Sequence, residues 1–152
     1  MENTHSQKVG QLERKTQNRI VSLFRDRLGY DYLGNWEDWD NNSNVAKEYL
    51  FNFLAKSGHS KEVIQKAVSE LKKSASRSHI SLYDLNREIY SYLRYGIKIR
   101  DGLGENYKTV WLINWEDPEQ NHFAIAEEVT IRGNRNKRPD IVLYVNGIAL
   151  GV

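Results

Sequence analysis

The sequence predicts an α+β protein, and three observations carry that prediction. Apolar residues recur at helical spacing through about the first 95 residues, and short β-branched and aromatic runs follow Gly96. An Asn146-Gly147 pair separates the last two of these runs. Helices followed by a meander of strands are typical of the α+β class. The length of 152 residues favours a single domain, with 1–95 mainly helical and 96–152 forming the strands.

Four helices are expected in the first part of the chain. The apolar positions of the first helix, which ends at Gly29, are Val9, Leu12, Ile20, Leu23, Phe24 and Leu28. A second helix runs from Val45 to about Lys56, and Ser60 caps a third. Ser81 and Asp84 form a capping box that opens a fourth, which ends before Gly96. The Asn- and Asp-rich segment 30–44 is expected to be a loop.

Four strands are expected after Gly96, over 109–115, 122–131, 140–145 and 148–152. The Asn-Gly pair predicts a type I′ hairpin between the last two strands, because both central residues of that turn need positive φ. In this register Asp140 faces position 153, just beyond the sequence. Because the chain ends at Val152 within an apolar run, we expect it to be the N-terminal fragment of a longer protein.

Composition and charge exclude several classes of protein. The chain has no cysteine, which excludes disulfides and thiolate chemistry, and it has no apolar run of the roughly 18 residues that a membrane helix needs. We therefore expect a soluble, cytoplasmic protein. The net charge is only +2, but residues 61–100 carry 9 basic and 4 acidic groups. Near the end, acidic residues precede a short basic run, a pattern that suits either a site for a cation and a phosphate or a solvated, salt-bridged face.

Glu13 is the first candidate for chemistry. A rotation of about 100° per helical residue places it among Val9, Ile20 and Phe24, within the apolar stripe. A buried carboxylate must be protonated, paired or bound to metal. The alternatives are that the side chain reaches water or pairs with an arginine.

Asp140 is the second candidate, because an acid that follows a proline and opens an apolar strand is unusual. It is a potential metal ligand, although it could instead neutralise Arg138 or Lys137. Glu127 and Glu128 lie on opposite faces of the preceding strand, and one of them could support such a site. The basic residues expected to contact DNA phosphates are Arg132, Arg135, Lys137 and Arg138.

Three segments together resemble a known family. They are SLYDLNREIYSYLRYGIKI, TVWLINWEDPEQNHFAIAEEVTI and KRPDIVLYVNGIALGV, which cover about 80–152. They resemble the N-terminal region of the R (HsdR) subunit of type I restriction–modification enzymes, and the first helix fits the same family more loosely. The ordered combination of N-W-x-x-P-E-x-N-x-F, R-P-D and V-N-G-I-A-L is specific to it. Ala149 stands where many relatives have proline, which concerns only the turn.

The resemblance implies a PD-(D/E)xK endonuclease fold, a mixed sheet flanked by helices, incomplete here because the E-x-K residues would follow Val152. It implies that Asp140 coordinates Mg²⁺, with Glu13 as the plausible glutamate of the first helix. The full subunit is then expected to be a type I site-specific deoxyribonuclease that cleaves unmodified foreign double-stranded DNA while it translocates with ATP. Its partners would be DNA and the specificity and methyltransferase subunits. The fragment alone is expected to be inactive and to bind no ATP.

Two other functions stay open at this point. The chain could be a non-catalytic module that docks to a subunit or binds DNA, with structural acids. It could also be a PD-(D/E)xK nuclease of another repair or restriction system.

Overall fold

The chain divides into two compact units, which we describe separately. The computed structural model describes residues 3–39, 43–102, 104, 106–131 and 137–152. Unit 1 consists of residues 1–46 and 122–152, and unit 2 consists of residues 47–121. Unit 1 therefore brings the N-terminal helix together with the last strands of the sequence.

Unit 1 begins with one long helix. Helix α1 (Asn3–Ser22) continues as a π-helical turn, η1 (Leu23–Arg27), and the helical backbone ends at Leu28. Gly29 follows with a φ of 72°, a left-handed conformation that glycine adopts without steric cost. The predicted first helix and its end at Gly29 are confirmed.

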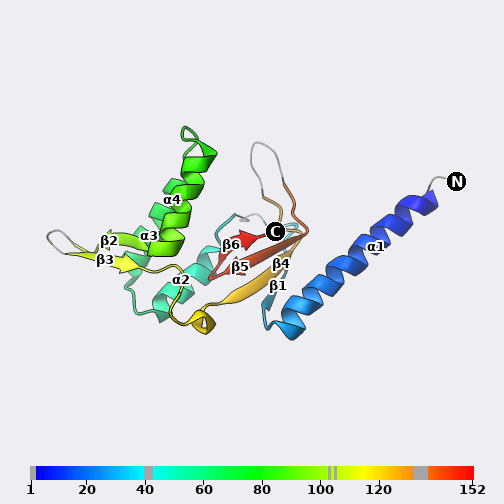
Figure 1. The fold of residues 1–152 in the computed structure, drawn as a ribbon, viewed down its shortest axis with the longest axis horizontal. Helices are drawn as coiled ribbons and strands as arrows, with labels where there is room; N and C mark the ends of the chain where they lie inside the picture. Colours follow the sequence, from blue (N-terminus) through cyan, green and yellow to red (C-terminus); the bar gives the residue numbers. More distant parts are fainter. Residues whose placement is uncertain (1–2, 40–42, 103, 105, 132–136) are drawn as a thin grey trace. The chain divides into compact units, whose positions relative to one another are not determined.

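A mixed four-stranded sheet forms the rest of unit 1 (Figure 1). Its strands are β1 (Asp31–Asn35), β4 (Phe123–Glu127), β5 (Ile141–Val145) and β6 (Ile148–Gly151). Their order is β1-β4-β5-β6, with β1 parallel to β4 and the other pairs antiparallel. The predicted α+β class, with a mixed sheet and helices, is confirmed.

The Asn-Gly turn has the geometry that the sequence predicts. Asn146 and Gly147 have φ values of 50° and 79°, and Val145 pairs with Ile148 across the turn. Between Tyr144 and Leu143 the register shifts by one residue, so that Leu143 pairs with Gly151. Extending this register places Asp140 opposite position 154 rather than 153, because the shift was not visible in the sequence.

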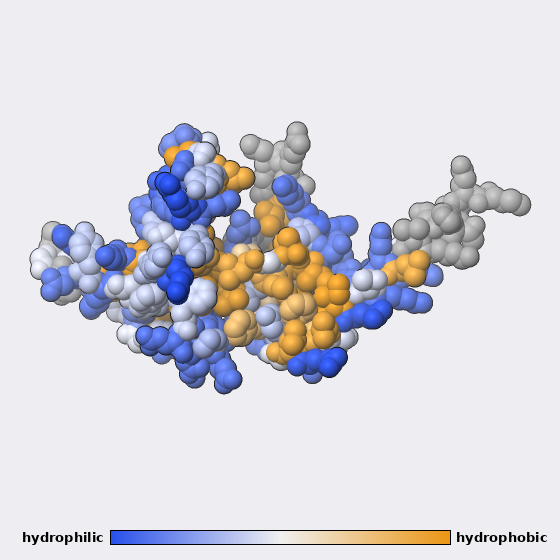
Figure 2. All heavy atoms as spheres, in the orientation of Figure 1, coloured by the Kyte–Doolittle hydropathy of each residue, from blue (hydrophilic) through white to orange (hydrophobic). Residues whose placement is uncertain are grey.

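Apolar side chains cover both faces of this sheet. On one face, Val142 and Tyr144 are buried and the Tyr144 ring lies 5.4 Å from that of Trp36. On the other, the rings of Phe24, Tyr30 and Phe123 form a chain of contacts that joins η1 to β4. Figure 2 shows apolar side chains gathered over the strands of this sheet.

Two predictions about unit 1 were wrong in detail. Segment 30–44 was expected to be a loop, but it contains the strand β1. This strand forms because the segment pairs with β4, which is distant in the sequence. The strand expected over 122–131 ends at Glu127, because Glu128 has a φ of 52° and leaves the extended conformation.

Unit 2 contains the remaining helices and a hairpin. Its elements are α2 (Lys47–Lys56), α3 (Lys61–Ala75), α4 (Leu82–Tyr95), β2 (Ile97–Arg100), β3 (Tyr107–Val110) and the 3₁₀ turn η2 (Pro118–Gln120). The hydroxyl oxygens of Ser60 and Ser81 accept hydrogen bonds from the backbone N–H groups of Val63 and Asp84. The three predicted helices and both caps are therefore confirmed.

The strands of unit 2 differ from the prediction. β2 was not expected, and β3 ends at Val110 instead of continuing to residue 115. Beyond β3, the side chain of Asn121 replaces a strand partner: its Oδ1 accepts from the N–H of Asn114 and its Nδ2 donates to the carbonyl of Asn114, both at 2.8 Å. In the part of the chain described, no helix is long and apolar enough to cross a membrane.

Gly96 connects α4 to β2 where the backbone comes close to β3. Its φ of 74° is left-handed, and a Cβ atom there would lie 2.6 Å from Cγ2 of Thr109 and 2.9 Å from the carbonyl oxygen of Val110. Only glycine therefore fits this position without displacing the hairpin.

We expect Gly96→Ala to lower the free energy of unfolding by about 1–3 kcal/mol, measured by chemical denaturation. Gly58→Ala is the matched control, because Gly58 has a similar φ of 85° but no atom within 4 Å of its added Cβ. An equal loss in both variants would show that the close approach at Gly96 contributes nothing.

Candidate functional site

Asp140 and Glu128 lie side by side at the ends of β5 and β4. The backbone N–H of Glu128 donates to the carbonyl of Asp140 at 2.9 Å, and that of Val129 donates to Pro139 at 3.2 Å. Further along, Ile131 and Lys137 exchange two backbone hydrogen bonds. The two acids are therefore neighbours because β4 and β5 remain paired beyond their regular ends.

Helix α1 contacts this pair through Gln17. The side-chain amide of Gln17 donates to Oε1 of Glu128 and to the backbone carbonyl of Asp140, both at 3.3 Å. Glu128 is mostly buried, with 17% of its side chain exposed, and its Oε2 lies 3.1 Å from Nε of Arg138. The carboxylate of Glu128 is thus held by the amide of Gln17 and the guanidinium of Arg138. The same amide also bonds the backbone of Asp140, so it links the two residues.

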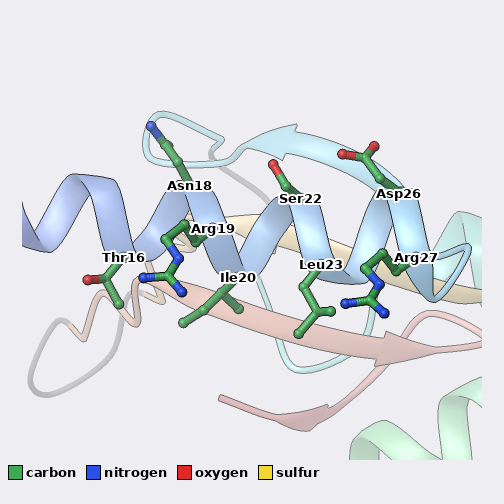
Figure 3. A pocket seen from close by; sticks show the side chains of 8 residues that line it. All are labelled: Thr16, Asn18, Arg19, Ile20, Ser22, Leu23, Asp26 and Arg27. Atoms are coloured by element: carbon green, nitrogen blue, oxygen red, sulfur yellow. The ribbon is translucent and has the colours of Figure 1, made fainter.

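Glu13 lies one helical turn before Gln17 and is exposed. The premise that the apolar stripe of this helix is buried was wrong, because Leu12, Ile20 and Leu23 are 64%, 36% and 41% exposed. Figure 3 shows Ile20 and Leu23 projecting from one side of the helix, in a shallow pocket of its surface. The helix buries Val21 instead, so Glu13 carries no buried charge.

The basic residues predicted to contact DNA are only partly described. Arg132 and Arg135 lie outside the described residues. Lys137 is exposed, three residues before Asp140. Arg138 is half exposed and pairs with two carboxylates, those of Glu128 and Glu37.

Glu127, the other acid of β4, is tied to β1. Its Oε2 accepts a hydrogen bond from the hydroxyl of Tyr32. This bond to a carboxylate, together with burial, raises the pKa of Tyr32 to about 12. Of the two acids that the sequence left undecided, Glu128 is therefore the one beside Asp140.

The donor atoms at this position suit a hard cation. Mg²⁺ is usually bound by one or two carboxylates, with waters and substrate phosphates completing its shell. The carboxylate of Asp140 is exposed and makes no hydrogen bond or ion pair with the described residues. Within those residues, no group of three acidic or histidine side chains is arranged to hold an ion. Asp140 therefore supplies one carboxylate of the kind that Mg²⁺ binds.

Sequence reasoning missed Gln17 and did not single out Glu128. The available signal was the spacing of Gln17, four residues after Glu13 and thus on the same side of the helix. The contact of Glu128 depends on its left-handed backbone, which no sequence pattern indicated.

We expect Glu127→Gln to bring the pKa of Tyr32 down towards its ordinary value of 10.0, followed by NMR titration of the tyrosine rings. The raised pKa means that the Tyr32–Glu127 bond stabilises the fold fully below pH 10.0 and is lost as the pH rises through about 12. Tyr144, whose pKa burial raises to about 12, is the internal control. A Tyr32 that titrates near 10 in the unmodified protein would contradict the contact.

Comparisons with known proteins identify the family of the chain. The family described as "Type I restriction enzyme R protein N terminus" matches residues 10–152. A curated relative from Methanocaldococcus jannaschii, described as "Putative type I restriction enzyme MjaVIIIP endonuclease subunit", is 36% identical over 66 residues. That match covers 41% of this chain but 6% of the relative, and no solved structure matches significantly. The family match spans nearly the whole sequence, and the chain belongs to the N-terminal family of type I restriction enzyme R proteins.

Proposed function

We propose that this chain is the endonuclease part of a type I restriction R subunit and that Asp140 is a ligand of the Mg²⁺ ion used for DNA cleavage. The observation that carries the proposal is the exposed carboxylate of Asp140, which has no hydrogen-bond or ion-pair partner among the described residues and lies beside Glu128 at the end of two paired strands. The family to which the chain belongs supports it. Such an ion would lower the pKa of a bound water and offset the charge that develops on the scissile phosphate.

The residues around Asp140 have distinct proposed roles. Asp140 contributes oxygen ligands, and Glu13 is proposed as a second ligand from α1, one turn from the Gln17 contact. Gln17 donates a hydrogen bond to the carboxylate of Glu128, and Arg138 supplies a compensating positive charge. The proposed phosphate contacts are Arg132, Arg135, Lys137 and Arg138. Of these, Lys137 is exposed next to the site.

The whole subunit is proposed to cleave unmodified foreign double-stranded DNA, coupled to translocation that consumes ATP. Its proposed partners are the specificity and methyltransferase subunits of a restriction–modification complex. The family and the relative described as an endonuclease subunit support these proposed roles. The match covers 6% of that relative.

We expect Asp140→Asn in the full-length R subunit, assembled with its partner subunits, to lower the rate of plasmid cleavage by about 100-fold or more, because an ion that stabilises the transition state contributes several kcal/mol. ATP hydrolysis should be unchanged. Asp117→Asn is the matched control, since Asp117 is an exposed aspartate of unit 2 without a capping hydrogen bond. Normal cleavage by the Asp140→Asn enzyme would refute the assignment.

We expect the 152-residue chain alone not to nick plasmid DNA in the presence of Mg²⁺. No E-x-K sequence follows Asp140 within it, so a lysine that could orient the attacking water is not supplied from the next strand. Gel analysis of supercoiled plasmid measures this. Mg²⁺-dependent nicking that Asp140→Ala abolishes would show that these 152 residues suffice for catalysis.

A further inference from the structure

Unit 2 carries an exposed face of aromatic and basic side chains that the proposed nuclease site does not use. It lies on the β2–β3 hairpin. In β2 the residues alternate between buried and exposed, with Ile97 and Ile99 buried and Lys98 and Arg100 exposed. The cross-strand partners of Lys98 and Arg100 are Thr109 and Tyr107. Residues paired in this way project from the same face of a hairpin, so all four share its exposed face.

Trp111 extends the same alternation beyond β3. Val110 and Leu112 on either side of it are fully buried, whereas Trp111 is 47% exposed. We call the set Lys98, Arg100, Tyr107, Thr109 and Trp111 the hairpin face. Neither β2 nor β3 contains an acidic residue. Lys108 lies on the opposite face of the hairpin, where its Nζ forms an ion pair with Oδ2 of Asp101 at 2.8 Å.

The cations and rings of the hairpin face are already arranged together. The guanidinium carbon of Arg100 lies 4.5 Å from the centre of the Tyr107 ring, a cation–π contact that holds both side chains outward. Tyr107 nevertheless remains 60% exposed. In Figure 2 the surface of this hairpin is largely hydrophilic to neutral, unlike the apolar surface over β4–β6. A purely apolar partner would therefore leave these charges without compensation.

We propose that the hairpin face binds an unpaired stretch of DNA, with Tyr107 and Trp111 stacking on bases and Lys98 and Arg100 contacting phosphates. Exposed rings beside cations on a two-stranded hairpin match the chemistry of single-stranded nucleic acid, whose bases are free to stack and whose backbone is negative. In a duplex the base faces are covered by neighbouring bases. Lys98 and Arg100 belong to residues 61–100, the segment in which 9 basic groups outnumber 4 acidic ones. Only the choice of DNA over RNA rests on the proposed function.

The test is the binding of a labelled thymidine oligonucleotide by the 152-residue chain, followed by fluorescence anisotropy without divalent ions. Cleavage does not enter this measurement, so failure of the nuclease assignment leaves it intact. We expect Tyr107→Ala and Trp111→Ala each to weaken binding by about fivefold or more, the loss typical of one base–aromatic stack. Tyr107→Leu retains an apolar side chain without the ring and should weaken binding in the same way.

The control is Tyr83→Ala, because Tyr83 is also an exposed tyrosine, 73% exposed, with the guanidinium carbon of Arg87 5.8 Å from its ring centre. It lies on α4, outside the hairpin face, and its loss should leave binding unchanged. Lys98→Gln and Arg100→Gln should each reduce the slope of log affinity against log salt by about 0.7. Circular dichroism and the thermal midpoint establish that each variant is folded.

Weaker binding by the ring variants with an unchanged Tyr83 control would support the proposal. Absence of binding, or ring variants that bind as the original chain does, would overturn it. A third outcome is that only Lys98→Gln and Arg100→Gln weaken binding, while a duplex binds with equal affinity. That result would show contact with phosphates alone and would also overturn the proposal. Tighter binding of an RNA of the same base sequence would overturn the assignment to DNA.

Discussion

The register between β4 and β5 is the constraint on which the candidate site depends. Asn146 fixes it: its buried side-chain oxygen accepts from the N–H of His122 at 2.7 Å, and its own N–H donates to the carbonyl of His122 at 2.8 Å. From there the strands pair without interruption to Glu127 and Ile141. Glu128 and Asp140 are therefore the next residues to meet. A slip of one residue would reverse the side-chain directions of β5 and separate the two acids.

The charges at this position are unequally compensated. Glu128 is mostly buried, and its carboxylate accepts a hydrogen bond from Gln17 and forms an ion pair with Arg138. Asp140 is exposed, and its carboxylate has no partner among the described residues. This asymmetry is the reason that we propose Asp140, and not Glu128, as the ligand of a cation. The pair formed by Arg138 and Glu37 is about half exposed on both sides, and such surface pairs typically contribute no more than about 1 kcal/mol. The proposed phosphate contact of Arg138 would therefore replace its contact with Glu37 at little cost.

Local patterns predicted the elements that local interactions determine. The four helices, the serine caps and the Asn146-Gly147 turn were visible because each depends on residues close in sequence. β1 and the role of Gln17 were not, since both depend on contacts across about 90 to 110 residues. The strand predicted to residue 115 failed because the amide of Asn121 bonds the backbone of Asn114 instead of a neighbouring strand. Asp140 was singled out as a candidate because it follows a proline, whereas the position of Glu128 beside it could be seen only in the fold.

The most direct test of the central claim is to locate the divalent ion itself. In this experiment Fe²⁺ is supplied to the full-length R subunit in place of the proposed Mg²⁺, and with ascorbate and peroxide it generates hydroxyl radicals that cut the backbone near the place where it binds. We expect cuts around residues 128 and 140, and we expect these cuts to be lost in the Asp140→Asn subunit. Cuts confined to other segments, or cuts that persist after this substitution, would contradict the claim.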